Sequence, residues 1–138
     1  MSFHGIPPLI MILLCMNGAF AQDDGSLSND EFLEILECVA KSGDGVLCDD
    51  FDRCNDLLIS RPRDTYEACV TLVLGNDDIG KCTDEEELYG NEDNRKQINK
   101  CFIENVPEDL NEDEQKNRED FANCVRDVGD DCSSEQSR

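Results

Sequence analysis

The sequence predicts an all-α protein, a compact bundle of about five helices cross-linked by four disulfides. Three observations support this prediction. Apolar residues recur in several segments at the three- and four-residue spacing of one helical face. Strand-type alternation is scarce, since the one β-like tripeptide, Leu72-Val73-Leu74, lies inside a helical pattern. Eight of the nine cysteines lie beyond residue 21, and an even number of cysteines in a small secreted domain indicates disulfides.

Residues 1–21 have the pattern of a secretory signal peptide. The apolar run 6–16 is followed by Ala-Phe-Ala, which fits an A-x-A cleavage site after Ala21. Two prolines interrupt the apolar segment, which leaves it too short to span a bilayer. Cleavage removes Cys15 and His4, so the mature chain keeps eight cysteines and no histidine, and we expect it to be secreted and extracellular.

The first helix is predicted to begin at Ser28 and to run to about Lys41. Ser28 and Glu31 fit a capping box, in which each side chain bonds the other residue's backbone N–H. Leu27 and Phe32 flank this cap at the positions of a hydrophobic staple.

Two further helices are predicted before residue 76. The second begins at Asp49 or Asp50 and continues until Pro62, because proline disrupts the interior of a helix. The third begins at Asp64 and ends at Gly75, since glycine adopts the left-handed conformation that terminates helices.

A short helical piece and a long helix are predicted next. Thr83 with Glu86 caps one or two turns that end at Gly90. The long helix covers 92–105 and ends before Pro107, with its apolar residues on one side.

The last helix is predicted from near Asn111, with Glu114 at its third position, to Val128. Residues 22–132 then form a single disulfide-stapled domain. Residues 133–138 contain no apolar side chain, so we expect a mobile C-terminal tail.

The mature cysteines are predicted to form four disulfides, each contributing about 2–4 kcal/mol to stability. They are Cys38, Cys48, Cys54, Cys69, Cys82, Cys101, Cys124 and Cys132. Eight cysteines allow 105 pairings, so the connectivity stays open. Five of them precede Gly90 and three follow it, so at least one bridge joins the two halves, which favours one domain.

Four of these cysteines share a local pattern with an apolar residue one turn before and another directly after. They are Cys38, Cys69, Cys101 and Cys124. On a helix these three positions share one face, so we expect the four sulfurs to point inward. Of the others, Cys54 lies on the second predicted helix, whereas Cys48, Cys82 and Cys132 are expected in or beside loops.

The charge balance excludes several functions. With 12 Lys and Arg against 33 Asp and Glu, the formal net charge is −21, which repels nucleic acid and anionic membrane surfaces. The loss of His4 removes the usual general base and most zinc sites. No Cys-x-x-Cys pair is present, which argues against a thiolate metal cluster. We therefore predict no catalytic residue, no metal site and no cofactor, and a protein that is not an enzyme.

The acidic clusters leave calcium binding as an open question. An EF-hand alignment over residues 76–87 places carboxylates and carbonyls at the ligand positions. However, Lys81 occupies the position that needs glycine, and Cys82 occupies the next ligand position. Solvated helix faces and favourable charges at helix N-termini account for most of the acids.

Two features are candidates for binding. The segments Arg61-Pro62-Arg63 and Arg95-Lys96 would place two exposed cationic spots on an acidic surface, although pairing with neighbouring acids is the simpler interpretation. Five aromatic residues are available to line a ligand cavity, although filling a thin core is the favoured interpretation. They are Phe32, Phe51, Tyr66, Phe102 and Phe121.

The combined pattern resembles the small cysteine-rich secreted proteins of arthropod venoms, saliva, silk and body fluid. The resemblance rests on the Ala-Phe-Ala leader end, the eight mature cysteines, the acidity and the helical cysteine pattern. The chain departs from odorant-binding proteins, which have six cysteines with a Cys-x-x-x-Cys pair, because the closest pair here is Cys48 and Cys54. It also departs from the short β-framework knottins. A venom-type resemblance implies a toxin-like or accessory component and transfers no site residue.

The leading hypothesis is therefore a secreted, acidic, disulfide-rich protein that binds another molecule without chemistry. Its partner would be an extracellular protein or receptor, and the acidic surface would suit a cationic one. The alternatives are an extracellular carrier of a small apolar ligand and a structural component of a secretion such as silk.

Overall fold

The computed structural model describes residues 27–136, so the predicted leader lies outside the described residues. Five helices account for most of this range, and the part described contains no strand beyond the isolated bridge between Glu87 and Gly90. The helices are α2 (Asn29–Ala40), α3 (Gly45–Asn55), α4 (Ser60–Leu74), α5 (Glu92–Asn105) and α6 (Glu112–Gln136). The predicted all-α class is confirmed.

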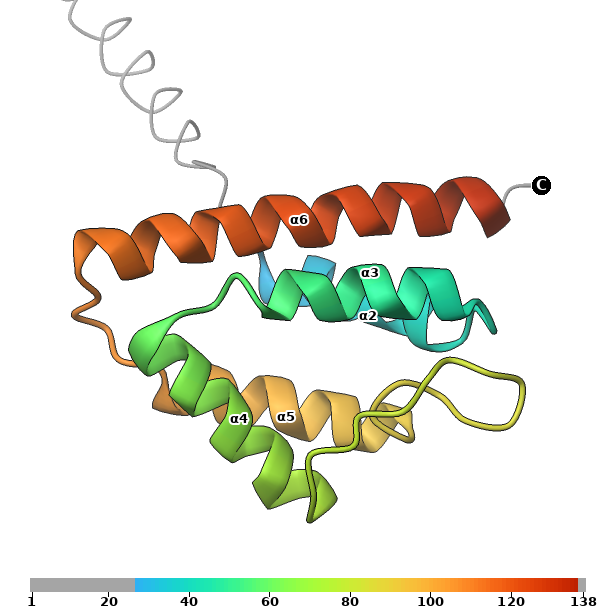
Figure 1. The fold of residues 1–138 in the computed structure, drawn as a ribbon, viewed down its shortest axis with the longest axis horizontal. Helices are drawn as coiled ribbons and strands as arrows, with labels where there is room; N and C mark the ends of the chain where they lie inside the picture. Colours follow the sequence, from blue (N-terminus) through green and yellow to red (C-terminus); the bar gives the residue numbers. More distant parts are fainter. Residues whose placement is uncertain (1–26, 137–138) are drawn as a thin grey trace, which may run out of the picture.

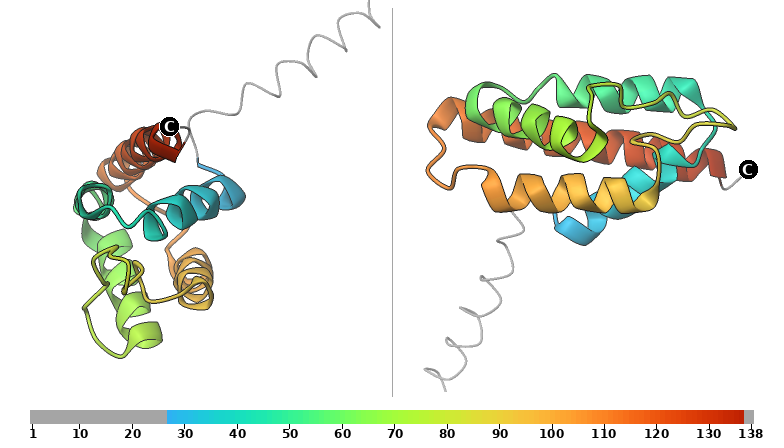
Figure 2. Two further views of the ribbon diagram at one scale, coloured as in Figure 1. Left: turned by 90° about the vertical axis from the view of Figure 1, so that its right-hand side faces the viewer. Right: turned by 90° about the horizontal axis from the view of Figure 1, so that it is seen from below.

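The helices form two layers, one of α3 and α6 and the other of α4 and α5 (Figure 1). The longest helix, α6, packs against α2 and α3, while α5 packs against α4 and α2. Helix α2 thus joins the two layers, as the view along the bundle shows (Figure 2). A long loop of residues 75–91 returns the chain from α4 to the start of α5.

Side-chain caps explain where four of the helices begin. The cap residues are Ser28, Asp44, Asn91 and Asn111. Ser28 Oγ accepts from the Glu31 N–H at 3.1 Å, as predicted. At the start of α6, Asn111 Oδ1 accepts from the Glu114 N–H at 2.8 Å, and Asn111 N–H donates to Glu114 Oε1 at 3.1 Å. This reciprocal pair is a capping box, and it confirms the predicted start.

The second and third helices begin earlier than predicted. Helix α3 starts at Gly45 because Asp44 Oδ1 accepts from the backbone N–H groups that open it, and it ends at Asn55, well before Pro62. Helix α4 starts at Ser60, so Pro62 lies in its first turn. Proline is tolerated there because the first N–H groups of a helix have no intrahelical partner.

The predicted short helix near Thr83 does not form. Thr83 Oγ1 does accept from the Glu86 N–H at 3.0 Å, but the chain bends and continues as a loop. The reason is the burial of Leu88 and Tyr89, which are 0% and 3% exposed and which the loop carries into the core. Gly90 follows with φ 90°, a conformation that suits glycine.

Helix α6 continues past its predicted end at Val128 to Gln136. Gly129 lies inside the helix, where it permits close packing with α2. A Cβ atom at Gly129 would lie only 2.7 Å from Ile35 Cγ1. Residues 133–136, which belong to the segment expected to be a mobile tail, form the last turn of α6.

Four disulfides cross-link the bundle, as the fold prediction required. They are Cys38–Cys132, Cys48–Cys82, Cys54–Cys124 and Cys69–Cys101. They join α2 to α6, α3 to the long loop, α3 to α6, and α4 to α5. Cys48 and Cys132 lie within helices rather than in or beside loops, which corrects that expectation. Three of the four bridges connect the parts of the chain before and after Gly90.

The core is small and contains much sulfur. Five of its buried members are bridged cysteines, alongside fully buried Phe51, Val39 and Val125. Because the bridges replace apolar side chains at the centre of the bundle, much of the stability must come from cross-linking rather than from burial of hydrocarbon.

Candidate functional site

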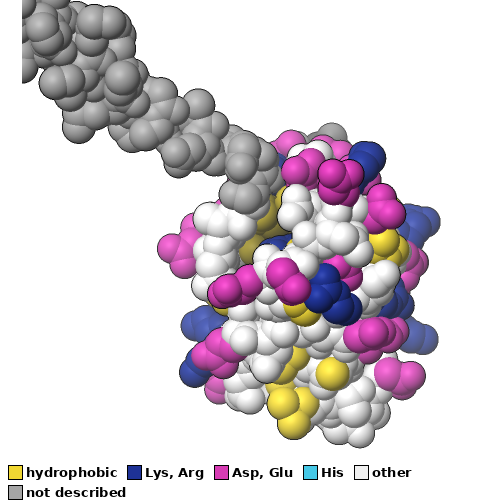
Figure 3. All heavy atoms as spheres, turned by 90° about the vertical axis from the view of Figure 1, so that its left-hand side faces the viewer, with side chains coloured by type: hydrophobic (Ala, Val, Ile, Leu, Met, Phe, Trp, Pro, Cys, Tyr) yellow, Lys and Arg dark blue, Asp and Glu magenta, His cyan; other side chains and the backbone are white. Residues whose placement is uncertain are grey.

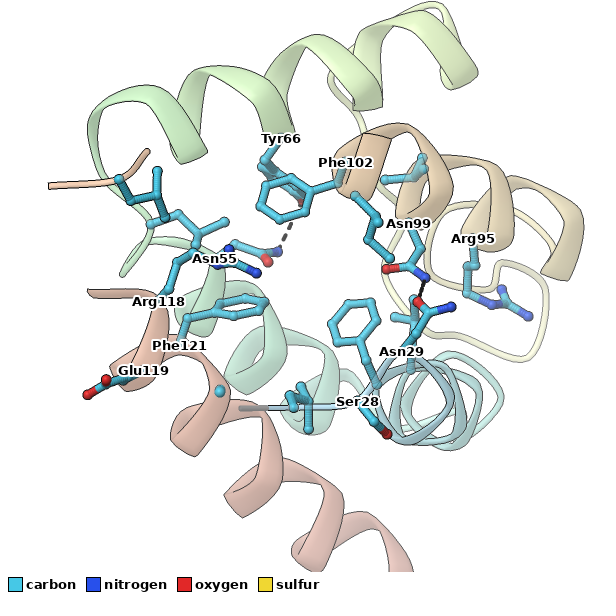
Figure 4. A pocket seen from close by; sticks show the side chains of 18 of the residues that line it. Ser28, Asn29, Asn55, Tyr66, Arg95, Asn99, Phe102, Arg118, Glu119 and Phe121 are labelled. Carbon is cyan, nitrogen blue, oxygen red and sulfur yellow. Dashed lines mark hydrogen bonds between the residues drawn. The ribbon is translucent and has the colours of Figure 1, made fainter. Parts of the chain in front are cut away.

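A cavity of about 360 Å³ opens between α2, α4, α5 and α6 (Figure 4). This volume lies in the range of small-molecule pockets, about 300–1,000 Å³. Most of its wall is apolar. The apolar lining residues are Leu27, Phe32, Leu36, Leu58, Ile98, Phe102, Ile103, Leu110, Phe121 and Ala122. Apolar side chains from three separate helices therefore line one hydrophobic space.

Four of the five aromatic residues singled out in the sequence lie at this cavity. They are Phe32, Tyr66, Phe102 and Phe121, which come from α2, α4, α5 and α6 respectively. The Phe32 and Phe121 rings are 6.2 Å apart between centroids. The favoured interpretation, core filling, holds fully for Phe51 alone, whose side chain is completely buried next to Phe32.

A buried hydrogen-bonded trio lies at one side of the cavity. The Tyr66 and Tyr89 hydroxyls are 2.6 Å apart, and Asn55 Nδ2 donates to both, at 3.1 Å and 3.3 Å. Burial raises the pKa of Tyr89 to about 12 and also raises the pKa of Tyr66. Tertiary folding alone brings Asn55 and Tyr89 here, and no sequence motif indicated either of them.

This trio predicts an unusual alkaline titration. Tyr66 and Tyr89 are the only tyrosines, and the chain has no tryptophan, so tyrosinate absorbance reports on these two residues. A free tyrosine ionises near pH 10. In the folded protein we expect both tyrosines to stay neutral until about pH 12, where Tyr89 titrates or the protein unfolds. Urea-unfolded protein is the control and should titrate normally. Tyrosinate absorbance rising at pH 10 in the folded state would contradict the buried trio.

The prediction that Arg95 lies in an exposed cationic spot is wrong. The Arg95 side chain is 0% exposed, and its guanidinium bonds Glu37 Oε1 at 2.7 Å, the Leu88 carbonyl at 2.8 Å and Glu87 Oε1 at 2.9 Å. Although Arg95 contributes to the cavity wall, its guanidinium points away from the cavity (Figure 4). Its neighbour Lys96 forms an exposed ion pair with Glu92. The cation therefore joins α5, α2 and the long loop instead of facing a partner.

The arginines of the other expected cationic spot, Arg61 and Arg63, also form ion pairs with carboxylates. Arg61 donates to Glu114 through its backbone N–H and its guanidinium, the shortest contact being 2.7 Å, and it also bonds Asp109. Arg63 pairs with Asp56 and Glu67. The simpler interpretation, pairing with neighbouring acids, is thus the one the structure shows.

Glu114 gives the clearest pH dependence. Hydrogen bonds from Arg61 lower its pKa from 4.5 to about 2, while its side chain is only 1% exposed. A lowered folded-state pKa stabilises the fold above the unfolded pKa, and this stabilisation is lost as the pH falls from about 4.5 to about 2. We expect Glu114→Gln to lower the melting temperature at pH 7 and to differ from the wild type progressively less over that interval. Asp109→Asn is the control, because Asp109 bonds the same arginine but is 85% exposed. A constant difference at every pH would contradict this role of Glu114.

Arg118 differs from Arg61, Arg63 and Arg95 in its electrostatic partners. It lies on α6 beside the cavity, with its guanidinium carbon 5.8 Å from the Phe102 ring centroid. Within residues 27–136 it forms no ion pair. The residue is exposed, and partial desolvation by the surrounding protein lowers its pKa. The adjacent Glu119 carboxylate points away from the cavity (Figure 4). No sequence signal distinguished Arg118 from the other arginines.

Acidic side chains line a second, shallow groove between α3 and α6. Asp50, Asp120, Asp127 and Asp131 contribute to it. On the face seen in Figure 3, acidic and basic side chains are interspersed, with hydrophobic atoms visible in several places between them. The groove is therefore a strongly anionic part of the surface.

In the loop considered for calcium binding, side-chain oxygens accept hydrogen bonds from nearby backbone N–H groups of the same loop. Asn76 Oδ1 accepts from the Asp78 N–H at 2.8 Å, and Asp78 Oδ1 accepts from the Gly80 N–H at 3.1 Å. In the part of the chain that the structure covers, no three His, Cys, Asp or Glu side chains are grouped to hold a metal ion.

No helix within the same range is long and apolar enough to cross a membrane.

Comparison with known proteins identifies a family that matches the chain. A family model described as Hi1a-like, U10-hexatoxin-Hi1a, matches residues 26–133, well over half of the 138-residue chain. The matched range includes all eight bridged cysteines and the cavity. No curated protein and no solved structure matches the chain.

Proposed function

The chain belongs to the Hi1a-like family, and from this membership we propose that it is a secreted, toxin-like venom component that binds an extracellular protein or receptor. The family description names a hexatoxin, which supports the venom type among the cysteine-rich arthropod proteins. The four disulfides support secretion, since such bridges persist in oxidising compartments.

The proposed action is binding without enzymatic chemistry. A rigid, cross-linked surface loses little conformational freedom on binding, which favours affinity. The net charge of −21 and the acidic groove between α3 and α6 support a cationic surface on the partner, because opposite charges speed the encounter.

An injection assay tests this proposal. Purified oxidised protein injected into a small arthropod should cause a dose-dependent loss of movement, because the cross-linked fold presents the binding surface. Protein that has been reduced and alkylated is the control and should be inert. If the protein acts by binding alone, the loss of movement reaches a maximum once the target is saturated. An enzyme would instead keep increasing the effect with time, even at a low dose. Equal potency after reduction, or an effect that keeps growing at trace doses, would contradict the proposal.

The cavity supports a second function, the carriage of a small apolar ligand. This is the alternative already indicated by the aromatic residues, and the largely apolar cavity of about 360 Å³ is the observation that favours it. Native mass spectrometry of the secreted protein tests it directly. A co-purifying lipid would support carriage, whereas a cavity that is empty in repeated preparations would count against it.

A further inference from the structure

We propose that the cavity binds a small amphipathic carboxylate, with its hydrocarbon tail among the helices and its anionic head on Arg118. This inference rests on the second proposed function, carriage of a small ligand, and adds the chemical class of that ligand. It is independent of the toxin-like action, which needs only the outer surface.

The first argument is the state of Arg118 among the arginines. In residues 27–136 the other arginines all lie within ion-pair distance of a carboxylate. They are Arg53, Arg61, Arg63, Arg95 and Arg126. In a chain with 33 Asp and Glu, an arginine without such a partner is unusual. Arg118 instead lies over Phe102 at the cavity, where an incoming carboxylate would supply the missing charge.

The second argument is that, apart from Glu119, whose carboxylate points away, the other polar side chains around the cavity already have partners. Asn55, Tyr66 and Tyr89 hydrogen-bond one another. Asn99 donates to Asn29 across the opposite wall, which joins α5 to α2 (Figure 4). A ligand that bonded these groups would first have to break existing bonds. The exposed Arg118 guanidinium, with five N–H donors, would have to release only water.

The third argument is the shape and chemistry of the remaining wall. Phe32, Ile98, Phe102 and Phe121 offer an apolar surface to a flexible chain, and their burial against a hydrocarbon tail is favourable. Such a tail would provide most of the affinity, while the single charge at the rim would select an acid over a neutral molecule. A multiply charged ligand is disfavoured because the protein itself carries −21.

The experiment compares decanoate with decanol, two ligands of the same chain length that differ in charge. Isothermal titration at pH 7, below micelle-forming concentrations, measures both affinities for the oxidised protein. We expect Arg118→Gln to weaken decanoate binding by about tenfold or more, since hydrogen bonds to charged groups are strong. Decanol binding should change less than twofold. Arg118→Lys should retain part of the decanoate affinity.

Arg53→Gln is the matched control, because it removes the same charge from an exposed ion pair with Asp50 outside the cavity lining. It should leave both affinities unchanged. If Arg118→Gln weakens both ligands equally, or neither, the anionic head on Arg118 is refuted while ligand carriage stands. If neither ligand binds the wild type, ligand carriage fails as well. The toxin-like action is unaffected by either result.

Discussion

Replacing Cys38 and Cys132 together by alanine is expected to lower the free energy of unfolding by about 3–4 kcal/mol. The two cysteines are 94 residues apart, but the intact Cys54–Cys124 bridge shortens the loop that they close to the segments 38–54 and 124–132, so the loss is that of a short loop. Domain stabilities are only about 5–15 kcal/mol, so the variant should lie near the limit of folding. Urea denaturation followed by far-UV circular dichroism, with the other bridges oxidised, measures the change.

The matched control is the double alanine variant of Cys48 and Cys82. This bridge spans 34 residues and ties α3 to a loop, and no other bridge shortens that loop, so its removal should cost about as much as that of Cys38 and Cys132. The difference is small because loop-closure entropy grows only with the logarithm of loop length. A loss below about 1 kcal/mol for Cys38 and Cys132 would contradict the view that cross-links, rather than the thin core, stabilise this bundle.

Replacing Arg95 by methionine is expected to lower the free energy of unfolding by about 3 kcal/mol. The side chain is fully buried and gives hydrogen bonds to Glu37, Glu87 and the Leu88 carbonyl. Removing it leaves these three acceptors without their donor. The loss is at the lower end for a broken buried pair because the Glu37 and Glu87 side chains, 27% and 40% exposed, can turn towards water.

Two variants sharpen the Arg95 prediction. Arg95→Lys keeps the charge but cannot reproduce the planar arrangement of donors, so we expect an intermediate loss. Lys96→Met is the control, since its ion pair with Glu92 is exposed and should contribute less than about 0.5 kcal/mol. Urea denaturation at pH 7 compares all of them. Equal stability of the Arg95→Met and Lys96→Met variants would show that the buried contacts contribute nothing.

Local signals predicted the helices well where a cap and an apolar face agreed. The range 92–105 was predicted with its bounds, and the starts at Ser28 and Asn111 were confirmed by their capping hydrogen bonds. Prediction failed where packing over-rode the local signal. Thr83 caps a turn without a helix because Leu88 and Tyr89 are drawn into the core, and α6 runs through Gly129 because α2 packs closely there.

The candidate site was only partly predictable. Four of its aromatic residues were recognised as potential lining, because large apolar rings must go to a core or a cavity. Asn55, Tyr89 and Arg118 were not recognised. Each lies in a stretch with no motif, and its role depends on contacts with residues far away in the sequence.

The sequence by itself determined the helical class and the presence of four cross-links, because helix periodicity, capping and an even cysteine count are properties of short segments or of composition. Only the tertiary structure decided which cysteines pair, that Arg95 is buried while Arg118 lacks an acidic partner, and that the aromatic residues leave a space between them. These outcomes depend on distances between helices, and such distances follow from the packing of the whole bundle rather than from any one segment.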